Sequence, residues 1–352
     1  MKPLKRIRVL VVDDSIVFRE TLCTNLSANS KLEVVGSATD SFDAMEKIKQ
    51  LNPDVVTLDV EMPKVNGIDF LKKLMPINPL PVVVVSSMPD RAFEALDAGA
   101  VDFVRKPMIK SPTDVSDFIN ELIVKIKIAS AAHIRKKPVL ATLPTSQFTA
   151  NIDNNMVIAI GASTGGTEAI LSVIKDLPAT TPGIVVVQHM PPVFTKMYAQ
   201  RLDKICAMTV KEAENLERVE KGKVIIAAGD SHLTLARDSR GFYVKSRPGE
   251  RVSGHCPSVD VLFHSVAAVA GANSIGILLT GMGADGAKGL LKMRQSGAYT
   301  IGQNKESCVV YGMPMVAYNI GAVTKQLPLL DIQEHIICYM NKLGNLKNNS
   351  CL

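Results

Sequence analysis

The strongest constraint on the fold is a regular alternation of short apolar runs with amphipathic segments. In residues 7–125, apolar runs of β-forming residues such as IRVLVV, LEVVGSA and DVVTLDV alternate with segments such as SFDAMEKIKQL. In the latter, apolar residues recur every three or four positions, as on one face of a helix. Strands that alternate with helices predict βαβ units and hence a parallel sheet with helices on both faces. We therefore expect an α/β protein.

The alternation stops and restarts once, which predicts two domains. Residues 126–150 contain Ser, Thr and Pro and a basic cluster at residues 135–137, and this composition favours a solvated linker over a binding motif. From Met156 the alternation resumes with MVIAIG, and LTLARDSRGFYVKS predicts a β-hairpin that turns at Asp238–Gly241. We expect a first domain at 1–125 and a second at 151–345, the latter a doubly wound, mostly parallel α/β domain with a β-hairpin.

Composition excludes several classes of protein. The net charge of +6 is spread over 352 residues, too small an excess to predict binding to nucleic acid or to a membrane surface. No run approaches the roughly 18 apolar residues that a membrane span needs, and the apolar run after the basic start is too short for a signal peptide. The six cysteines form no CxxC pair, which favours a reducing compartment. We expect a cytoplasmic protein without direct membrane insertion.

Charged and hydroxyl side chains follow the predicted strands of the first half. Asp13 and Asp14 follow the first strand, Asp59 the third, and Ser86 and Lys106 the next two. The carboxyl ends of parallel strands open onto one crevice, so these side chains are expected to converge. Three carboxylates repel one another unless a cation holds them, and Mg²⁺ prefers hard oxygen ligands. The pattern indicates a site that carries phosphate on a carboxylate, although each acid alone is more simply a helix N-cap.

The first half resembles a response-regulator receiver domain, a (βα)5 flavodoxin-like fold. The similarity rests on VVDDS, LDVEMPKVNG, VSS and RKP and covers roughly 118 residues. It implies a cis Lys106–Pro107 bond. The segment between Ser86 and Gly99 is short for the family, which leaves the fourth helix open. The resemblance also implies the site residues: Asp59 as the phosphoacceptor, Asp13 and Asp14 with Asp59 as Mg²⁺ ligands, Ser86 and Lys106 as switch and phosphate contacts, and Phe103 as the aromatic switch residue.

A glycine-rich turn carries one serine at the start of the second half. The stretch GASTG fits the spacing G-x-S-x-G, which between a strand and a helix can raise Ser163 on a sharp turn. Glycines in that position also bind pyrophosphate, so the spacing alone decides little. A dinucleotide-binding site typically has an acidic residue near the end of the second strand, where it binds the ribose hydroxyls. Here that strand ends in Gln188 and His189, which disfavours a dinucleotide.

His189 instead offers a base at the predicted sheet edge that carries Ser163. Asp285 ends another predicted strand and is suited to orient His189, so Ser163, His189 and Asp285 predict a catalytic triad. Their order differs from the Ser, Asp, His order of α/β-hydrolases, which argues against that fold. Taken singly, each of the three is more commonly a cap, loop or turn residue. Three other histidines also compete as the base: His232, His264 and, most strongly, His255.

Residues from about 155 to 340 resemble the catalytic domain of the chemotaxis protein-glutamate methylesterases. The matching stretches include IAIGASTGGTEAI, QHMPPVFT, PSVDVLFHSVA and ILLTGMGADGAKG. The resemblance implies that Ser163 is the nucleophile, His189 the general base and Asp285 its orienting carboxylate, with no cofactor in the esterase site. Two positions depart from the family pattern: Cys256, where Arg is common, and Met315, where a basic residue is usual.

The order of the two resemblances, receiver then esterase, is that of the family. It implies a monomer that hydrolyses glutamate γ-methyl esters on chemoreceptor helices with release of methanol, and that deamidates receptor glutamines. It further implies that the receiver blocks the active site until a chemotaxis histidine kinase phosphorylates Asp59. Two other classes of protein are disfavoured. A DNA-binding output module needs a basic helix-turn-helix, whereas the second half has an α/β pattern; a nucleotide-binding oxidoreductase is disfavoured by Gln188 and His189.

Overall fold

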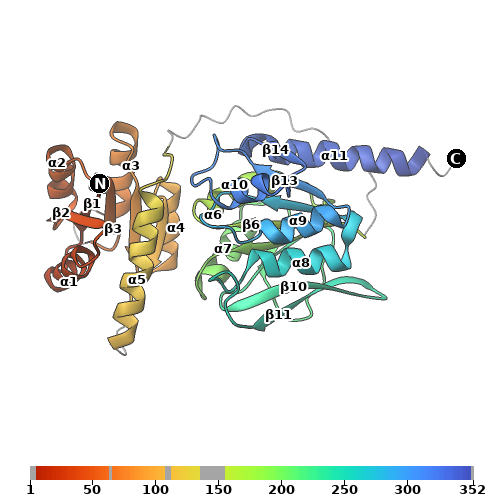
Figure 1. The fold of residues 1–352 in the computed structure, drawn as a ribbon, viewed down its shortest axis with the longest axis horizontal. Coiled ribbons are helices and arrows are strands. Elements are labelled where there is room, and N and C mark those ends of the chain that lie inside the picture. Colours follow the sequence, from red (N-terminus) through yellow and green to blue (C-terminus); the bar gives the residue numbers. More distant parts are fainter. Residues whose placement is uncertain (1–4, 63–65, 108–111, 135–154, 350–352) are drawn as a thin grey trace. The chain divides into compact units, whose positions relative to one another are not determined.

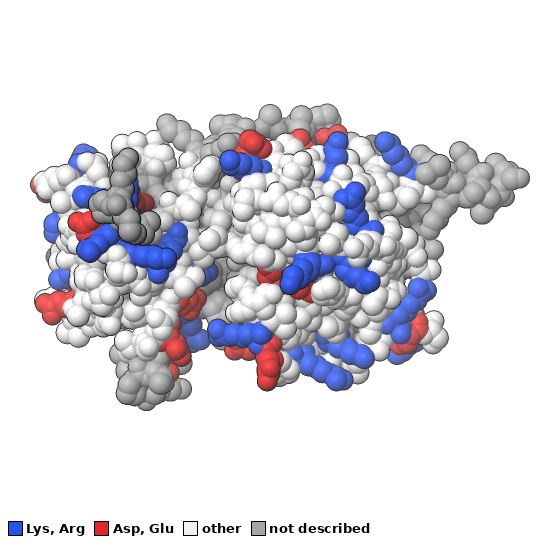
Figure 2. Space-filling model, in the orientation of Figure 1, with Lys and Arg blue, Asp and Glu red and all other residues white. Residues whose placement is uncertain are grey.

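The structure is a computed structural model that describes residues 5–62, 66–107, 112–134 and 155–349 (Figure 1). The chain divides into two compact units, Met1–Leu140 and Ala141–Leu352. Most of the predicted linker, including its basic cluster, lies outside the described residues. In the described parts of the chain, no helix is long and apolar enough to cross a membrane. On the face seen in Figure 2, Lys and Arg side chains are scattered among uncharged residues, with Asp and Glu between them.

The first unit is a five-stranded parallel sheet with helices on both faces, as predicted. The strand order is β2-β1-β3-β4-β5. Helix α1 contacts α5, whereas α3 contacts α2 and α4. The strands are β1 Ile7–Val12, β2 Leu32–Ala38, β3 Val55–Asp59, β4 Val82–Ser86 and β5 Asp102–Arg105. The helices are α1 Ile16–Ser27, α2 Ser41–Leu51, α3 Gly67–Ile77, α4 Pro89–Asp97 and α5 Pro112–Ala129. The fourth helix, which the sequence left open, does form, although it has only nine residues.

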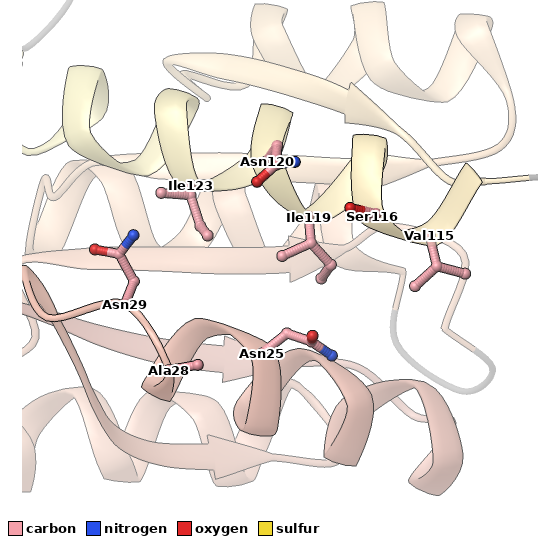
Figure 3. A pocket seen from close by; sticks show the side chains of 8 residues that line it. All are labelled: Asn25, Ala28, Asn29, Val115, Ser116, Ile119, Asn120 and Ile123. Carbon is pink, nitrogen blue, oxygen red and sulfur yellow. The ribbon is translucent and has the colours of Figure 1, made fainter. Parts of the chain in front are cut away.

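Burial explains why the central strands of this unit are continuous apolar runs. Every residue of β3 and β4 is buried, as expected for parallel strands covered by helices on both faces. A shallow pocket of about 390 Å³ lies between α1 and α5 (Figure 3). None of the predicted site residues lines this pocket, whose lining consists of Asn25, Ala28, Asn29, Val115, Ser116, Ile119, Asn120 and Ile123.

The second unit contains a seven-stranded parallel sheet in the order β14-β13-β12-β6-β7-β9-β8. Its strands are β6 Val157–Ala162, β7 Gly183–Gln188, β8 Thr209–Glu212, β9 Lys223–Ile226, β12 Ser274–Leu278, β13 Tyr299–Gln303 and β14 Lys325–Leu327. The longer helices are α6 Gly166–Ile174, α7 Phe194–Asp203, α8 Val259–Val269, α9 Ala287–Gln295, α10 Met313–Asn319 and α11 Leu329–Asn349; a short 3-10 helix, η1, spans Gly271–Asn273.

The predicted hairpin is present as a separate two-stranded sheet. β10 Ser231–Asp238 pairs antiparallel with β11 Gly241–Pro248, and Asp238 opposes Gly241 across the turn. Helix α8 packs on β10 and on β6 (Figure 1). The approach of α8 to β6 is close: a Cβ on Gly161 would lie 2.2 Å from Cγ1 of Val259, the first residue of α8. Gly161, in the glycine-rich stretch, therefore makes room for a helix.

Candidate active site

The strand order places Ser163 and His189 side by side. Ala162 at the end of β6 pairs with Gln188 at the end of β7, and Ser163 and His189 are the next residues of the two strands. The His189 backbone N–H donates to the Ala162 carbonyl at 3.2 Å, and the Ser163 N–H donates to the Thr280 carbonyl at 3.0 Å. Both predicted residues therefore stand at the carboxyl edge of the sheet, on neighbouring strands.

The turn after Ser163 differs from the strained serine turn that G-x-S-x-G suggests. Ser163 is not among the described non-glycine residues with positive φ; the left-handed conformation falls on Gly165, at φ 75°. The Gly166 N–H donates to the Ser163 carbonyl at 2.7 Å and closes the turn. Helix α6 begins at Gly166, so Ser163 stands just before the positive end of that helix.

Asp285 binds His189 through a single ring nitrogen. His189 Nε2 lies 2.8 Å from Asp285 Oδ2, and both side chains are buried. The Nδ1 atom of His189 is also buried and has no hydrogen-bond partner in the structure. Because a carboxylate only accepts hydrogen bonds, Nε2 carries the proton, which leaves Nδ1 of the neutral ring as a proton acceptor. The structure contains no hydrogen bond between this atom and Ser163, a contact that often tightens only when substrate binds.

The N-terminus of α8 holds the Asp285 carboxylate. Oδ1 accepts from Ser258 Oγ at 2.8 Å and from the Asp260 N–H at 3.0 Å, and Oδ2 accepts from the Val259 N–H at 2.8 Å. Burial acts to raise the pKa of Asp285, but the hydrogen bond and charge of His189 and the backbone donors of α8 outweigh it, and the pKa is lowered. Asp285 is therefore held as a carboxylate, able to orient His189.

The predicted acidic cluster of the first unit also converges. One oxygen from each of Asp13, Asp14 and Asp59 lies within 4.8 Å of the others. Lys106 Nζ contacts Asp59 Oδ2 at 2.5 Å and Asp13 Oδ2 at 3.5 Å. Burial and the Asp59 charge raise the pKa of Asp13 to about 6, although Lys106 acts in the opposite direction. Asp13 Oδ2 has no hydrogen-bond partner. A buried oxygen that lacks a hydrogen bond, in a cluster of three carboxylates, suits a hard divalent cation.

Ser86 is bound by Glu61, a residue that sequence reasoning did not single out. Ser86 Oγ donates to Glu61 Oε1 at 2.7 Å. The same carboxylate accepts from Ser87 N–H and Oγ, each at 2.7 Å, and from the Met88 N–H at 3.1 Å. Burial acts to raise the pKa of Glu61, but these donors outweigh it and lower the pKa. Glu61 thus holds the loop between β4 and α4.

Two expectations from the receiver resemblance concern Phe103 and the Lys106–Pro107 bond. Phe103 is buried, 5% exposed, and its ring lies 6.2 Å from that of Phe93 in an edge-on contact. The expected cis bond at Lys106–Pro107 is not found, and among the described residues the cis bond is Cys256–Pro257. A trans X–Pro bond is the intrinsically favoured isomer by roughly 0.5–1 kcal/mol, so the motif alone does not impose cis.

Protein-family models match both halves of the chain: the response regulator receiver domain over residues 9–115 and CheB methylesterase over residues 158–336. A protein-glutamate methylesterase/protein-glutamine glutaminase of Syntrophomonas wolfei is 53% identical over 341 residues, which cover 97% of this chain and 99% of that protein. The chain belongs to the CheB methylesterase family. It is a protein-glutamate methylesterase and protein-glutamine glutaminase with a receiver domain.

Other relatives of this CheB family member agree with the assignment. The protein-glutamate methylesterase/protein-glutamine glutaminase of Salmonella typhimurium is 45% identical over 338 residues, 95% of this chain and 97% of that protein. Among solved structures, the catalytic domain of Thermotoga maritima CheB methylesterase matches with a TM-score of 0.51 at 40% identity. It covers 52% of this chain and 97% of that domain.

The rival histidines of this CheB methylesterase occupy other places. His264 is exposed on α8. His232 accepts from the Ser258 N–H through Nδ1 at 3.2 Å, and its Nε2 lies 2.7 Å from the Glu250 carbonyl. His255 stacks on His189, with ring centroids 3.7 Å apart and planes inclined by 11°. Of the four, His189 is the one bound to Asp285.

Gln188 has a role that sequence reasoning missed, because in the sequence it stands out only as the absence of an acid at the end of its strand. Its Nε2 donates to the carbonyls of Ser163 at 2.9 Å and of His189 at 3.2 Å. The side chain is 4% exposed. One buried amide therefore ties together the backbone of both residues. Its position at the end of a buried strand, where a polar residue needs a partner, was the available signal.

Proposed function

We propose that Ser163 is the nucleophile, His189 the general base and Asp285 the orienting carboxylate of this methylesterase. The substrates are glutamate γ-methyl esters and glutamines on the cytoplasmic helices of chemoreceptors. The observation that carries the proposal is the use of Nε2 by Asp285, which leaves Nδ1 buried and without a hydrogen-bond partner in a residue whose strand pairs with the strand that Ser163 follows.

The chemistry then follows from the protonation state of His189. Nδ1 takes the Ser163 proton as Oγ attacks the ester carbonyl, and backbone N–H groups near the glycine turns hold the oxyanion. The imidazolium, stabilised by Asp285, returns the proton to the leaving methoxide, which departs as methanol. A water deprotonated by His189 then attacks the acyl carbonyl, and the bond to Ser163 Oγ breaks as the imidazolium returns the proton to Oγ, which leaves a glutamate side chain on the receptor. A glutamine loses ammonia by the same steps.

In the receiver, Asp59 is the proposed acceptor of a phosphoryl group from a chemotaxis histidine kinase. Asp13, Asp14 and Asp59 would hold Mg²⁺, which supplies positive charge to the phosphoryl oxygens. Lys106, already in contact with Asp59, is suited to pair with the phosphoryl group. Ser86 is suited to donate to it once its hydroxyl leaves Glu61, a change that would move the loop before α4.

The proposed domains are a receiver at 1–125, a linker at 126–150 and the catalytic domain at 151–345. Two compact units and the two family matches support this division. The unphosphorylated receiver is proposed to restrain the catalytic domain, with Phe103 contributing to the switch. A cytoplasmic monomer completes the proposal; the described cysteines, all of them unpaired, are consistent with a reducing compartment.

The catalytic assignment is tested by Ser163→Ala in the full chain. Methanol release from membranes that contain methyl-labelled chemoreceptors should fall by about a thousandfold or more, since one member of a triad is lost. Ser239→Ala, in the exposed hairpin turn, is the matched control and should behave like the parent. Methanol release that survives in Ser163→Ala would refute the assignment.

The regulatory assignment is tested by Asp59→Asn. Acetyl phosphate should stimulate the parent but not this variant, because an amide cannot form the acyl phosphate. Asp69→Asn, which removes an exposed carboxylate from α3, should keep the stimulation. Equal stimulation of Asp59→Asn and the parent would remove Asp59 as the phosphoacceptor.

A further inference from the structure

His255 covers one face of the His189 ring. The two rings are stacked and nearly parallel, with planes inclined by 11° and centroids 3.7 Å apart. This separation is that of rings in van der Waals contact, and His255 is itself half-buried. The His189 ring is also restrained by the hydrogen bond from Nε2 to Asp285. That bond fixes one atom of the ring but leaves the ring able to tilt around it.

The turn that presents His255 has a defined geometry. Val252 and His255 exchange two backbone hydrogen bonds, each 3.0 Å long, across a two-residue loop. Both loop residues have positive φ, 54° at Ser253 and 85° at Gly254. Positive φ at both central residues is typical of a type I′ turn, one of the tightest ways to reverse a chain. His255 therefore lies at the end of a hydrogen-bonded turn and not in an open loop.

The same segment continues directly to the residues that hold Asp285. Ser258, three residues after His255, donates to Asp285 and caps α8. His232 bridges the two ends of the segment, because it contacts the Ser258 N–H and the Glu250 carbonyl. The face of His189 and the carboxylate that binds its edge are thus fixed by one short stretch, residues 250–260.

We propose that His255 is a positioning residue for the reaction at Ser163, an inference that rests on the proposed role of His189. Its flat ring fixes the plane of His189, so that Nδ1 stays aimed at the strand end that carries Ser163 while Nε2 stays on Asp285. The stack persists when His189 takes the proton, since the face of a neutral ring tolerates a neighbouring cation. His255 itself neither donates nor accepts the transferred proton. The feature that acts on His189 is the flat face of the His255 ring.

Replacement by Phe and by Leu separates this role from simple filling of space. His255→Phe keeps a flat ring, and its kcat for methanol release from methylated receptor membranes should stay within about threefold of the parent. His255→Leu keeps apolar bulk without a flat face, and its kcat should fall by roughly 10- to 100-fold, the scale of a small misplacement of a catalytic group. KM should change little in either variant, because the ring of His255 acts on His189 and not on the substrate.

Three outcomes would overturn the proposal: equal kcat values for Leu, Phe and parent, an equal loss in Phe and Leu, or a change in KM alone. Thermal unfolding of the full chain identifies a variant that fails to fold. If Leu fails in this way, His255→Gln, which is polar but lacks a ring, takes its place with the same expected loss. Ser163→Ala, assayed in parallel, distinguishes failure of the triad assignment from failure of this inference.

Discussion

Replacement of Asp285 by Asn tests the geometry of the active site most directly. Each carboxylate oxygen accepts two hydrogen bonds: Oδ1 from Ser258 Oγ and the Asp260 N–H, and Oδ2 from His189 Nε2 and the Val259 N–H. An amide of the same shape has one acceptor and one donor group. Its NH₂ must therefore face one of these two pairs of donors.

Either orientation leaves a backbone N–H without its acceptor. In the first orientation the NH₂ group takes the place of Oδ1, and the Asp260 N–H loses its acceptor. In the second orientation the NH₂ group takes the place of Oδ2, and the Val259 N–H loses its acceptor. An unsatisfied buried donor costs about 1–3 kcal/mol, and loss of a negative charge at a helix N-terminus adds roughly 0.3–2 kcal/mol. We expect the catalytic unit to lose about 2–4 kcal/mol of unfolding free energy.

The effect on activity has a separate cause. In the second orientation His189 would accept at Nε2 and carry its proton on Nδ1, so it could not receive a proton from Ser163. In the first orientation the charge that stabilises the imidazolium is lost. Methanol release should therefore fall by roughly 10²- to 10⁴-fold.

The sequence provides a specific probe of this unit. The chain has no Trp, and its six Tyr all lie between residues 198 and 339. Tyrosine fluorescence in urea therefore reports unfolding of the catalytic unit within the full chain. Asp176→Asn, which removes an exposed carboxylate just after α6, is the charge-matched control.

The pH dependence follows from the lowered pKa of Asp285. The contribution of this carboxylate to the free energy of unfolding is lost only as pH falls below its ordinary value of 3.8. The stability difference should thus be constant from about pH 5 to pH 8. Unchanged stability, or activity within tenfold of the parent, would contradict this reasoning.

Three further predictions concern other sites. The pKa of Asp13, about 6, lies above its ordinary value of 3.8, so the metal-free receiver should lose stability, by up to about 3 kcal/mol, as pH rises through 6. Asp13→Asn should abolish that loss, as measured by hydrogen exchange in β1; a variant that keeps the same pH slope would disprove it. Glu61→Gln weakens the hold on Ser86 and should speed phosphorylation of Asp59 by acetyl phosphate about threefold to tenfold; slower labelling with radioactive phosphodonor would contradict this. A Cβ on Gly281 would lie 2.7 Å from Ser163 Cβ, so Gly281→Ala should lower kcat by roughly 10- to 100-fold, and parent-like methanol release would show that the site adapts.

The sequence was most informative where function depends on strand order. Ser163, His189 and Asp59 directly follow or end parallel strands, so their convergence at sheet edges could be predicted from the alternation of strands and helices. The hairpin turn at Asp238–Gly241 was likewise predictable from local turn residues. In these cases the deciding interactions are local, or are fixed by the topology of a parallel sheet.

The less predictable elements have weak local signals. β8 is a short edge strand with a largely polar sequence, TVKE, and β14 has three residues. β13, although mostly buried, contains a glycine and was not predicted. α10 and α11 were also missed. Whether these segments form strands or helices depends on packing against distant parts of the chain, and the periodicity of the sequence gives no information on that packing.

The supporting contacts of the site were beyond the sequence for a related reason. Ser258 and the following N–H groups meet Asp285 where α8 begins, and the absence of side chains at Gly161 and Gly286 leaves room there for Val259, the first residue of α8. Sequence reasoning recognised His255 as a competitor for His189 but had no means to find that the two rings stack. Contacts of this kind join residues that are far apart in the sequence, and the periodic patterns of single elements do not reveal which of them meet.

The choice of ring nitrogen has a consequence for covalent inhibitors. In chymotrypsin-type triads the carboxylate binds Nδ1 and the serine faces Nε2, whereas here Asp285 binds Nε2. Nδ1 is the ring nitrogen nearer the main chain, so an alkylating group that reaches the base must pass deeper, toward the end of β7. Electrophiles shaped for the exposed tip of a histidine would therefore be poorly matched to His189, and short, slender reagents would be favoured.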